Sequence, residues 1–60
     1  MKFNDAMKLH RGDRVTVKKT KKNMQVVDIE VTPAEHTTNN MTCVDVKTED
    51  GSWYGYKELL

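Results

Sequence analysis

The stretch from residue 43 to residue 56, CVDVKTEDGSWYGY, constrains the fold most, because it joins an alternating apolar run to a turn and three of the four aromatic residues. Val44 and Val46 alternate with Asp45 and Lys47, which is the period-two pattern of a strand with one buried face. The Asp-Gly pair that follows is a strong short-range hairpin signal. This stretch therefore predicts a β-hairpin.

Two turn geometries are compatible with this hairpin. A two-residue loop at Asp50-Gly51 places Trp53 on the same face as the valines. A type I turn one residue earlier, with the glycine left-handed as a G1 bulge, pairs Val46 with Tyr54 and directs Trp53 outward beside Lys47. We favour the second geometry because it stacks valines against tyrosines, which are then expected to be buried.

Two alternating runs precede the hairpin. Residues 13–19 predict a first strand with Val15 and Val17 facing inward. Residues 24–32 predict a long second strand with Val26 facing outward, and its inner residues are expected to be Val27, Ile29 and Val31. The predicted core thus combines valines and one isoleucine from three strands.

Both ends of the chain predict short helical turns. Phe3 and the residues up to Leu9 form an amphipathic turn that Asn4 or Asp5 can cap and Gly12 ends. Residues 57–60 predict a second helical turn or a last strand. A turn this short is unstable alone, so the N-terminal one is expected to lie on the rest of the domain.

Sixty residues predict one domain, residues 1–60, that buries only about 60% of its unfolded surface. Charged residues make up 32% and apolar residues 37%, but the apolar residues are patterned, which favours a folded domain over disorder. Four to five short antiparallel strands bury so few valines most economically in a small, strongly bent barrel. The predicted class is mainly β, with a short N-terminal helical turn.

Two segments resemble a known group of folds. SH3-like barrels, including the KOW and Tudor-like branches, open with a "GDxVxV" pattern that resembles Arg11-Gly12-Asp13-Arg14-Val15-Thr16-Val17. Their closing hairpin and terminal turn look like Asp50-Gly51-Ser52-Trp53-Tyr54 followed by Glu58-Leu59. The resemblance covers residues 12–60 and implies an SH3-like barrel, similar to short bacterial or phage proteins of that fold.

Composition argues against several classes of function. Cys43 is the single cysteine, so no internal disulfide forms and a reducing cytoplasm is expected, with Cys43 as a small buried residue. With only His10 and His36 beside it, no four-ligand zinc site of thiolates and imidazoles can be assembled, and we expect no cofactor. No apolar run is long enough for a membrane helix. A chain this short encloses too little space for a substrate, so no enzyme is expected.

Three features are candidates for binding. Trp53 beside Lys47 offers an aromatic surface, and the loop of residues 33–40, which includes His36, offers a recognition loop. A basic turn for phosphates consists of Lys18, Lys19, Lys21 and Lys22. Because the net charge is only +1, we expect a non-catalytic protein-binding module, such as an adaptor or small inhibitor of bacterial or phage origin. The alternative is a nucleic-acid-associated module that uses the basic turn.

Overall fold

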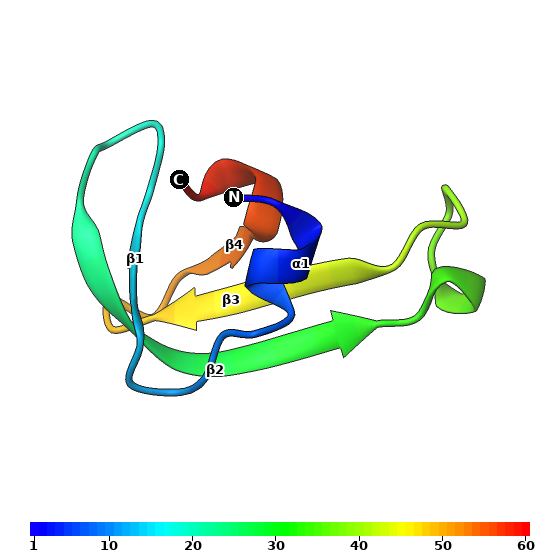
Figure 1. The fold of residues 1–60 in the computed structure, drawn as a ribbon, viewed down its shortest axis with the longest axis horizontal. Helices are drawn as coiled ribbons and strands as arrows, with labels where there is room; N and C mark the ends of the chain where they lie inside the picture. The colour runs from blue at the N-terminus through cyan, green and yellow to red at the C-terminus, as the bar shows by residue number, and fades with distance from the viewer.

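The computed structural model describes residues 1–60 and shows four antiparallel strands that form one curled half-barrel (Figure 1). The strands lie in the sheet in chain order and are β1 (Arg14–Thr16), β2 (Asn23–Thr32), β3 (Cys43–Thr48) and β4 (Trp53–Gly55). The other elements are the helix α1 (Phe3–Ala6) and the 3-10 turns η1 (Ala34–His36) and η2 (Tyr56–Glu58). The predicted mainly β class with an N-terminal helical turn is confirmed.

The helix α1 is held by packing and not by a side-chain cap. Its N-cap is Lys2, which makes no capping hydrogen bond, so the predicted cap at Asn4 or Asp5 is wrong. Ala6 is buried, and the ring of Phe3 meets the ring of Tyr56 edge to face, with centroids 5.8 Å apart. A four-residue helix has too few internal hydrogen bonds to be stable alone, so these contacts hold it in place.

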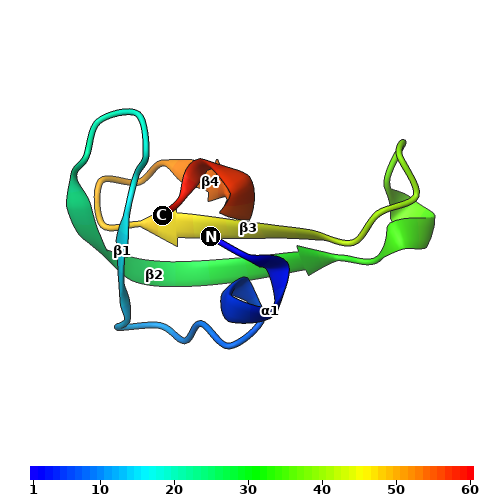
Figure 2. The same cartoon turned by 45° about the horizontal axis from the view of Figure 1, so that its top comes forward.

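The C-terminal segment closes the half-barrel against β1. Leu59 forms a bridge with Val17, the Lys18 N–H donates to the Glu58 carbonyl (2.9 Å), and the Leu60 N–H donates to the Thr16 carbonyl (2.8 Å). The end of the chain therefore contains both of the predicted elements, a 3-10 turn and then a strand-like bridge. Figure 2 shows the two termini lying close together beside β1.

A β-bulge divides β2. Val26 pairs with Thr48 and Asp28 pairs with Lys47, so Val27 is the extra residue of the ladder. Val26 is buried and Val27 is exposed, which corrects the predicted inward position of Val27 and outward position of Val26. The backbone explains the reversal, because Val26 N–H and C=O bond to Asp13 and Gly12 beside β1, and the extra residue shifts the register of the β2–β3 ladder directly after Val26.

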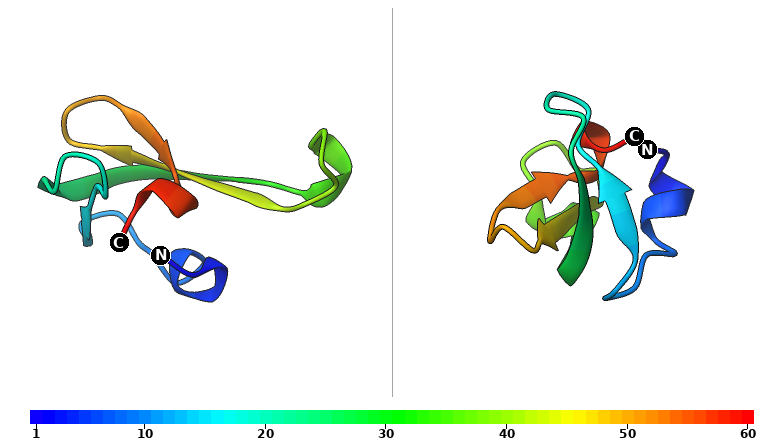
Figure 3. Two further views of the ribbon diagram at one scale, coloured as in Figure 1. Left: turned by 90° about the horizontal axis from the view of Figure 1, so that it is seen from above. Right: turned by 90° about the vertical axis from the view of Figure 1, so that its left-hand side faces the viewer.

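Beyond the bulge, the β2–β3 hairpin extends past the core. Ile29 and Val31 lie opposite Val46 and Val44, on the predicted inner face, but Ile29 is only half-buried and Val31 is 44% exposed. The molecule is 31 Å long and about 20 Å across, and Figure 3 shows this hairpin reaching away from the other elements. We call residues 28–45 the projecting hairpin.

The β3–β4 turn adopts the favoured geometry. Val46 pairs with Tyr54, Lys47 pairs with Trp53, and Gly51 has φ +83°, as a G1 bulge requires. The ladder then stops at Gly55, because η2 begins at the next residue, and both tyrosines are half-buried where burial was expected.

The core lies between the curled sheet, α1 and the C-terminal segment. It contains eight buried apolar side chains: Ala6, Val15, Val17, Met24, Val26, Val44, Val46 and Leu59. The inward positions predicted for Val15, Val17, Val44 and Val46 are confirmed. Thr48 is also fully buried, and its hydroxyl donates to the Asp50 carboxylate.

Candidate functional site

A row of side chains crosses the outer face of the sheet and ends at Trp53. Trp53 on β4 lies opposite Lys47 on β3, and Lys47 lies opposite Asp28 on β2. Arg11 donates to the Asp28 carboxylate at 3.2 Å. We call these four residues the tryptophan row. The predicted neighbourhood of Trp53 and Lys47 is confirmed, and Trp53 is 45% exposed.

Asp28 anchors the charges of the tryptophan row. Its carboxylate accepts the Ile29 N–H (2.8 Å) and the Arg11 guanidinium, and these two hydrogen bonds, with the nearby charge of Lys47, hold the pKa of Asp28 below its usual value. Asp28 is therefore ionised at neutral pH and lies between two cations. This arrangement holds Arg11 at Asp28 on the outer face, and Lys47 lies between Asp28 and Trp53.

The β3–β4 turn fixes where Trp53 lies. The Asp50 carboxylate accepts the Thr48 hydroxyl and the Ser52 N–H (3.1 Å), and both bonds lower the pKa of Asp50. Gly51 N–H donates to the Thr48 carbonyl (2.9 Å), which closes the turn. Because the turn sets the register of a hairpin, these contacts decide that Trp53 and not Tyr54 faces outward.

The basic turn of residues 18–22, here the lysine turn, connects β1 to β2. Its side chains are all exposed, and Lys21 adopts a left-handed backbone with φ 61°. The Val17 N–H donates to the Lys22 carbonyl and the Lys21 N–H to the Val17 carbonyl, so the backbone of the turn is closed. The two ion pairs with arginine use Arg11 and Arg14, and a third close contact joins His36 to Glu35, so no lysine has an ionic partner.

An open groove runs between the lysine turn and β4. It has a volume of about 630 Å³ and is lined by Val17, Lys18, Lys19, Thr20, Tyr54 and Glu58. We call it the lysine groove. The sequence separates Tyr54 from the lysines by more than thirty positions, and the curl of the sheet brings them together. Trp53, the next residue along β4, faces the opposite side and shares no groove with the lysines.

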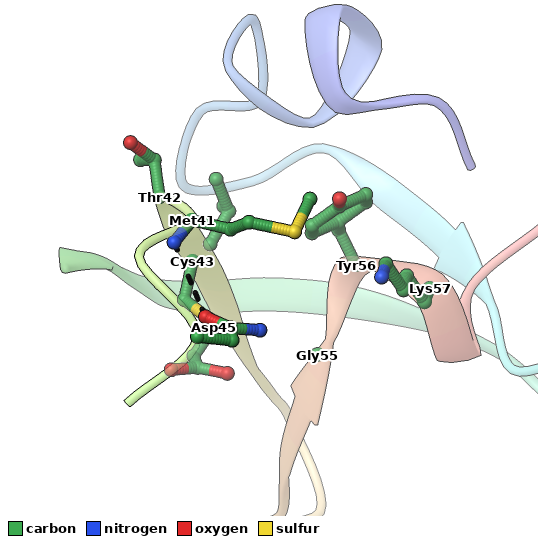
Figure 4. Close-up of a pocket in the computed structure, with 9 residues that line it drawn as sticks. Met41, Thr42, Cys43, Asp45, Gly55, Tyr56 and Lys57 are labelled. Carbon is green, nitrogen blue, oxygen red and sulfur yellow. Dashed lines mark hydrogen bonds between the residues drawn. The ribbon is translucent and has the colours of Figure 1, made fainter. Parts of the chain in front are cut away.

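A second, more apolar groove lies where β4 ends and leaves the β3 edge uncovered (Figure 4). Met41 extends its thioether toward the ring of Tyr56, and Cys43 and Asp45 line the β3 side. The groove continues to Phe3. Cys43, expected to be a small buried residue, is only half-buried here. Thr32, its partner in the ladder, lies at the end of β2, where the core no longer covers the sheet.

His36 lies far from the other predicted site residues. It ends the 3-10 turn η1 at the tip of the projecting hairpin, at the opposite end of the molecule from the lysine turn (Figure 1). Its only ionic neighbour is Glu35, at 3.8 Å. The predicted site residues thus form three separate groups: Trp53 with Lys47, the four lysines of the lysine turn, and His36 alone.

Sequence reasoning missed two parts of these surfaces. The ion pair between Arg11 and Asp28 joins a turn to the bulge of β2, and simple alternation along β2 does not predict that bulge. Glu58 is predicted only as part of a terminal turn, but its carboxylate accepts the Gly55 N–H at 2.8 Å and lines the lysine groove. The spacing of the glycine and the glutamate, three residues apart at the start of a helical turn, is the signal that suggests this cap.

Comparisons with known proteins add no assignment. No protein-family model, no curated protein sequence and no solved structure matches the chain. The structure holds no group of three or more side chains arranged to bind a metal ion. None of its helices has the length and apolar character needed to span a bilayer.

Proposed function

We propose that this protein is a small non-catalytic binding module and that a protein partner docks on the tryptophan row. The observation that carries the proposal is the position of Trp53, which is 45% exposed beside Lys47 on a face that also carries the Arg11–Asp28 ion pair. Tryptophan and arginine are the residues most enriched at the energetic centres of protein interfaces. A large aromatic ring next to fixed charges suits a partner that covers the ring and pairs with the rim.

The finer description of the fold is part of this proposal. We infer an SH3-like barrel, supported by a four-strand meander, a 3-10 turn after β4 and a terminal segment that returns to β1. These are the elements that the resemblance of the opening and closing segments implies. An adaptor or small inhibitor of bacterial or phage origin, acting in the cytoplasm, is consistent with a single unpaired cysteine.

The test is affinity capture from a cell extract of the source organism with Trp53→Ala and a matched control. Met41→Ala is the control, because Met41 is exposed to a similar degree, 51% against 45% for Trp53, and lies off the tryptophan row. We expect Trp53→Ala to weaken capture by at least about tenfold and to change the free energy of unfolding by less than about 1 kcal/mol. Equal capture by both variants would show that the outer face is not the binding surface.

Nucleic acid binding in the lysine groove is the second candidate function. It is favoured by one observation, that Tyr54 shares a groove with Lys18 and Lys19, because an aromatic ring beside cations can stack a base near bound phosphates. If it holds, affinity for DNA falls steeply with salt. Replacing the four lysines of the lysine turn by glutamine then flattens the salt slope by about 0.9 for each duplex phosphate that the variant no longer neutralises.

A further inference from the structure

The half-barrel has an open seam along β4. β4 pairs with β3 on one edge, and no strand pairs with its other edge. The lysine groove, of about 630 Å³, lies along this open edge, between Tyr54 and the lysine turn. An extended chain is the natural occupant of an unpaired strand edge, because its backbone can continue the ladder.

The backbone of β4 presents hydrogen-bonding groups to the seam. In an antiparallel ladder, successive residues direct their N–H and C=O groups to alternate edges. Gly55 N–H donates to the Glu58 carboxylate at 2.8 Å, so Gly55 directs its groups away from β3, and Trp53, two residues earlier, does the same. The Glu58 carboxylate accepts the N–H of Gly55, so the backbone N–H and C=O of Trp53 are the groups that a partner strand can pair with.

The charges that line the groove indicate the charge of the segment that can bind there. Lys18 and Lys19 line the groove with exposed ammonium groups and have no ionic partner. The one acidic side chain in the lining, Glu58, is already hydrogen-bonded to Gly55. The groove is therefore complementary to carboxylates on the occupant.

We propose that an extended acidic segment of a protein partner adds to the open edge of β4 as a further strand of the sheet. This inference deepens the proposed function and rests on it, since the same partner would cover Trp53. Side chains of a strand alternate between faces. The residue opposite Tyr54 enters the lysine groove and is acidic, and the residue opposite Trp53 lies on the outer face and is apolar.

Two features favour a peptide over a nucleic acid in the seam. The open edge offers amide and carbonyl groups in the geometry of a β-ladder, which a peptide backbone complements and a phosphate backbone does not. The Glu58 carboxylate lies in the groove and repels any anion next to it, but a strand can place an uncharged residue beside Glu58 and a carboxylate beside the lysines, whereas every nucleotide of a strand carries a phosphate.

The experiment titrates the full chain with a short end-capped peptide that alternates glutamate and valine. Trp53 is the only tryptophan, so its fluorescence reports binding at β4 directly. The first control is the peptide with lysine in place of glutamate. The second is a pair of peptides with N-methyl groups on the amides of one strand edge or the other. We expect saturable binding of the acidic peptide alone, and a loss of at least about tenfold when the ladder-forming edge is methylated.

Charge variants locate the peptide. Lys18→Glu combined with Lys19→Glu is expected to weaken binding of the acidic peptide by at least about tenfold. The control combines Lys2→Glu with Lys8→Glu, which changes the net charge equally outside the groove and is expected to leave the affinity unchanged. Circular dichroism confirms that each variant is folded. Slower hydrogen exchange of the Trp53 amide on binding is a second measurement that supports the added strand.

Three results would overturn the inference. The first is equal affinity of the two methylated peptides. The second is unchanged affinity of the acidic peptide for the Lys18 and Lys19 variant. The third is displacement of the bound peptide by oligothymidylate at a lower concentration than an unlabelled copy of the peptide requires. If the acidic peptide does not bind while Trp53→Ala still abolishes capture from extract, the added strand at β4 is wrong and the docking of a partner on the tryptophan row stands. If the peptide binds with these properties but capture ignores Trp53→Ala, the added strand at β4 is supported and the docking of a partner on the tryptophan row is wrong.

Discussion

The two halves of β2 carry similar sequences but have different surroundings. Before the bulge, Met24 and Val26 are 8% and 1% exposed, because β1, β3 and the C-terminal segment surround them. After the bulge, Val31 lies on the same inner face and is 44% exposed, because β3 is its only strand neighbour. Alternation along a strand tells which face a side chain is on, but not whether anything covers that face.

The same contrast separates the candidate binding surfaces. The lysine turn and the β3–β4 turn both lie at the compact end of the molecule, opposite the tip of the projecting hairpin (Figure 1). His36 lies on the projecting hairpin, which rests on few elements. A surface on a packed scaffold keeps its geometry before binding, which is why the proposed binding surfaces are those at the compact end.

The largest expected effect tests whether the C-terminal segment closes the compact end. Leu59 is 0% exposed and Leu60 is 56% exposed, so the two adjacent leucines form a matched pair. We expect Leu59→Ala to cost about 3 kcal/mol and Leu60→Ala less than about 0.5 kcal/mol in urea unfolding. A domain of this size has only about 3 to 5 kcal/mol in total, so the Leu59 variant should be largely unfolded at about 37 °C. Similar midpoints for both variants would mean that the segment does not dock.

The next effect tests the bulge that separates the halves of β2. Val26 is buried and Val27 is 42% exposed, although the two residues are identical and adjacent. We expect Val26→Ala to cost about 2 kcal/mol and Val27→Ala about 0.5 kcal/mol or less, measured by the shift in urea midpoint. The reverse order would restore the simple alternation without a bulge. Val31→Ala is the control on the projecting hairpin and should resemble Val27→Ala.

The smallest effect concerns acid and the turn at the compact end. The pKa values of Asp28 and Asp50 are lowered in the folded protein by the hydrogen bonds that their carboxylates accept. A lowered native pKa stabilises the fold above the ordinary aspartate pKa of 3.8, and this contribution is lost as pH falls below that value through the native one. Asp50→Asn should therefore show a shallower loss of stability in acid. An unchanged acid profile would mean that the Asp50 carboxylate is not engaged.

Much of the candidate site could be predicted from short segments of the chain. Of the two turn geometries that the segment allows, the G1-bulge register is favoured because it stacks Val46 against Tyr54, and the structure confirms that it places Trp53 outward beside Lys47. The exposure of the lysines follows from their position in a turn between two alternating runs. These features depend on residues within a few positions of one another, where turn chemistry and alternation act directly.

Long-range contacts decided the remainder. The extra residue at Val27 shifts the register of the β2–β3 ladder, at the point along β2 where the bonds to the β1 side end, and no local pattern contains this shift. The pairing of Arg11 with Asp28, and the groove that Tyr54 shares with Lys18, arise only when the sheet curls. The sequence by itself determined the strands and the turns between them, and limited Trp53 to two turn registers, because backbone sterics and side-chain alternation are local. Which faces are covered, and where the open seam lies, was decided by tertiary structure, because burial is a property of whichever distant segments pack there.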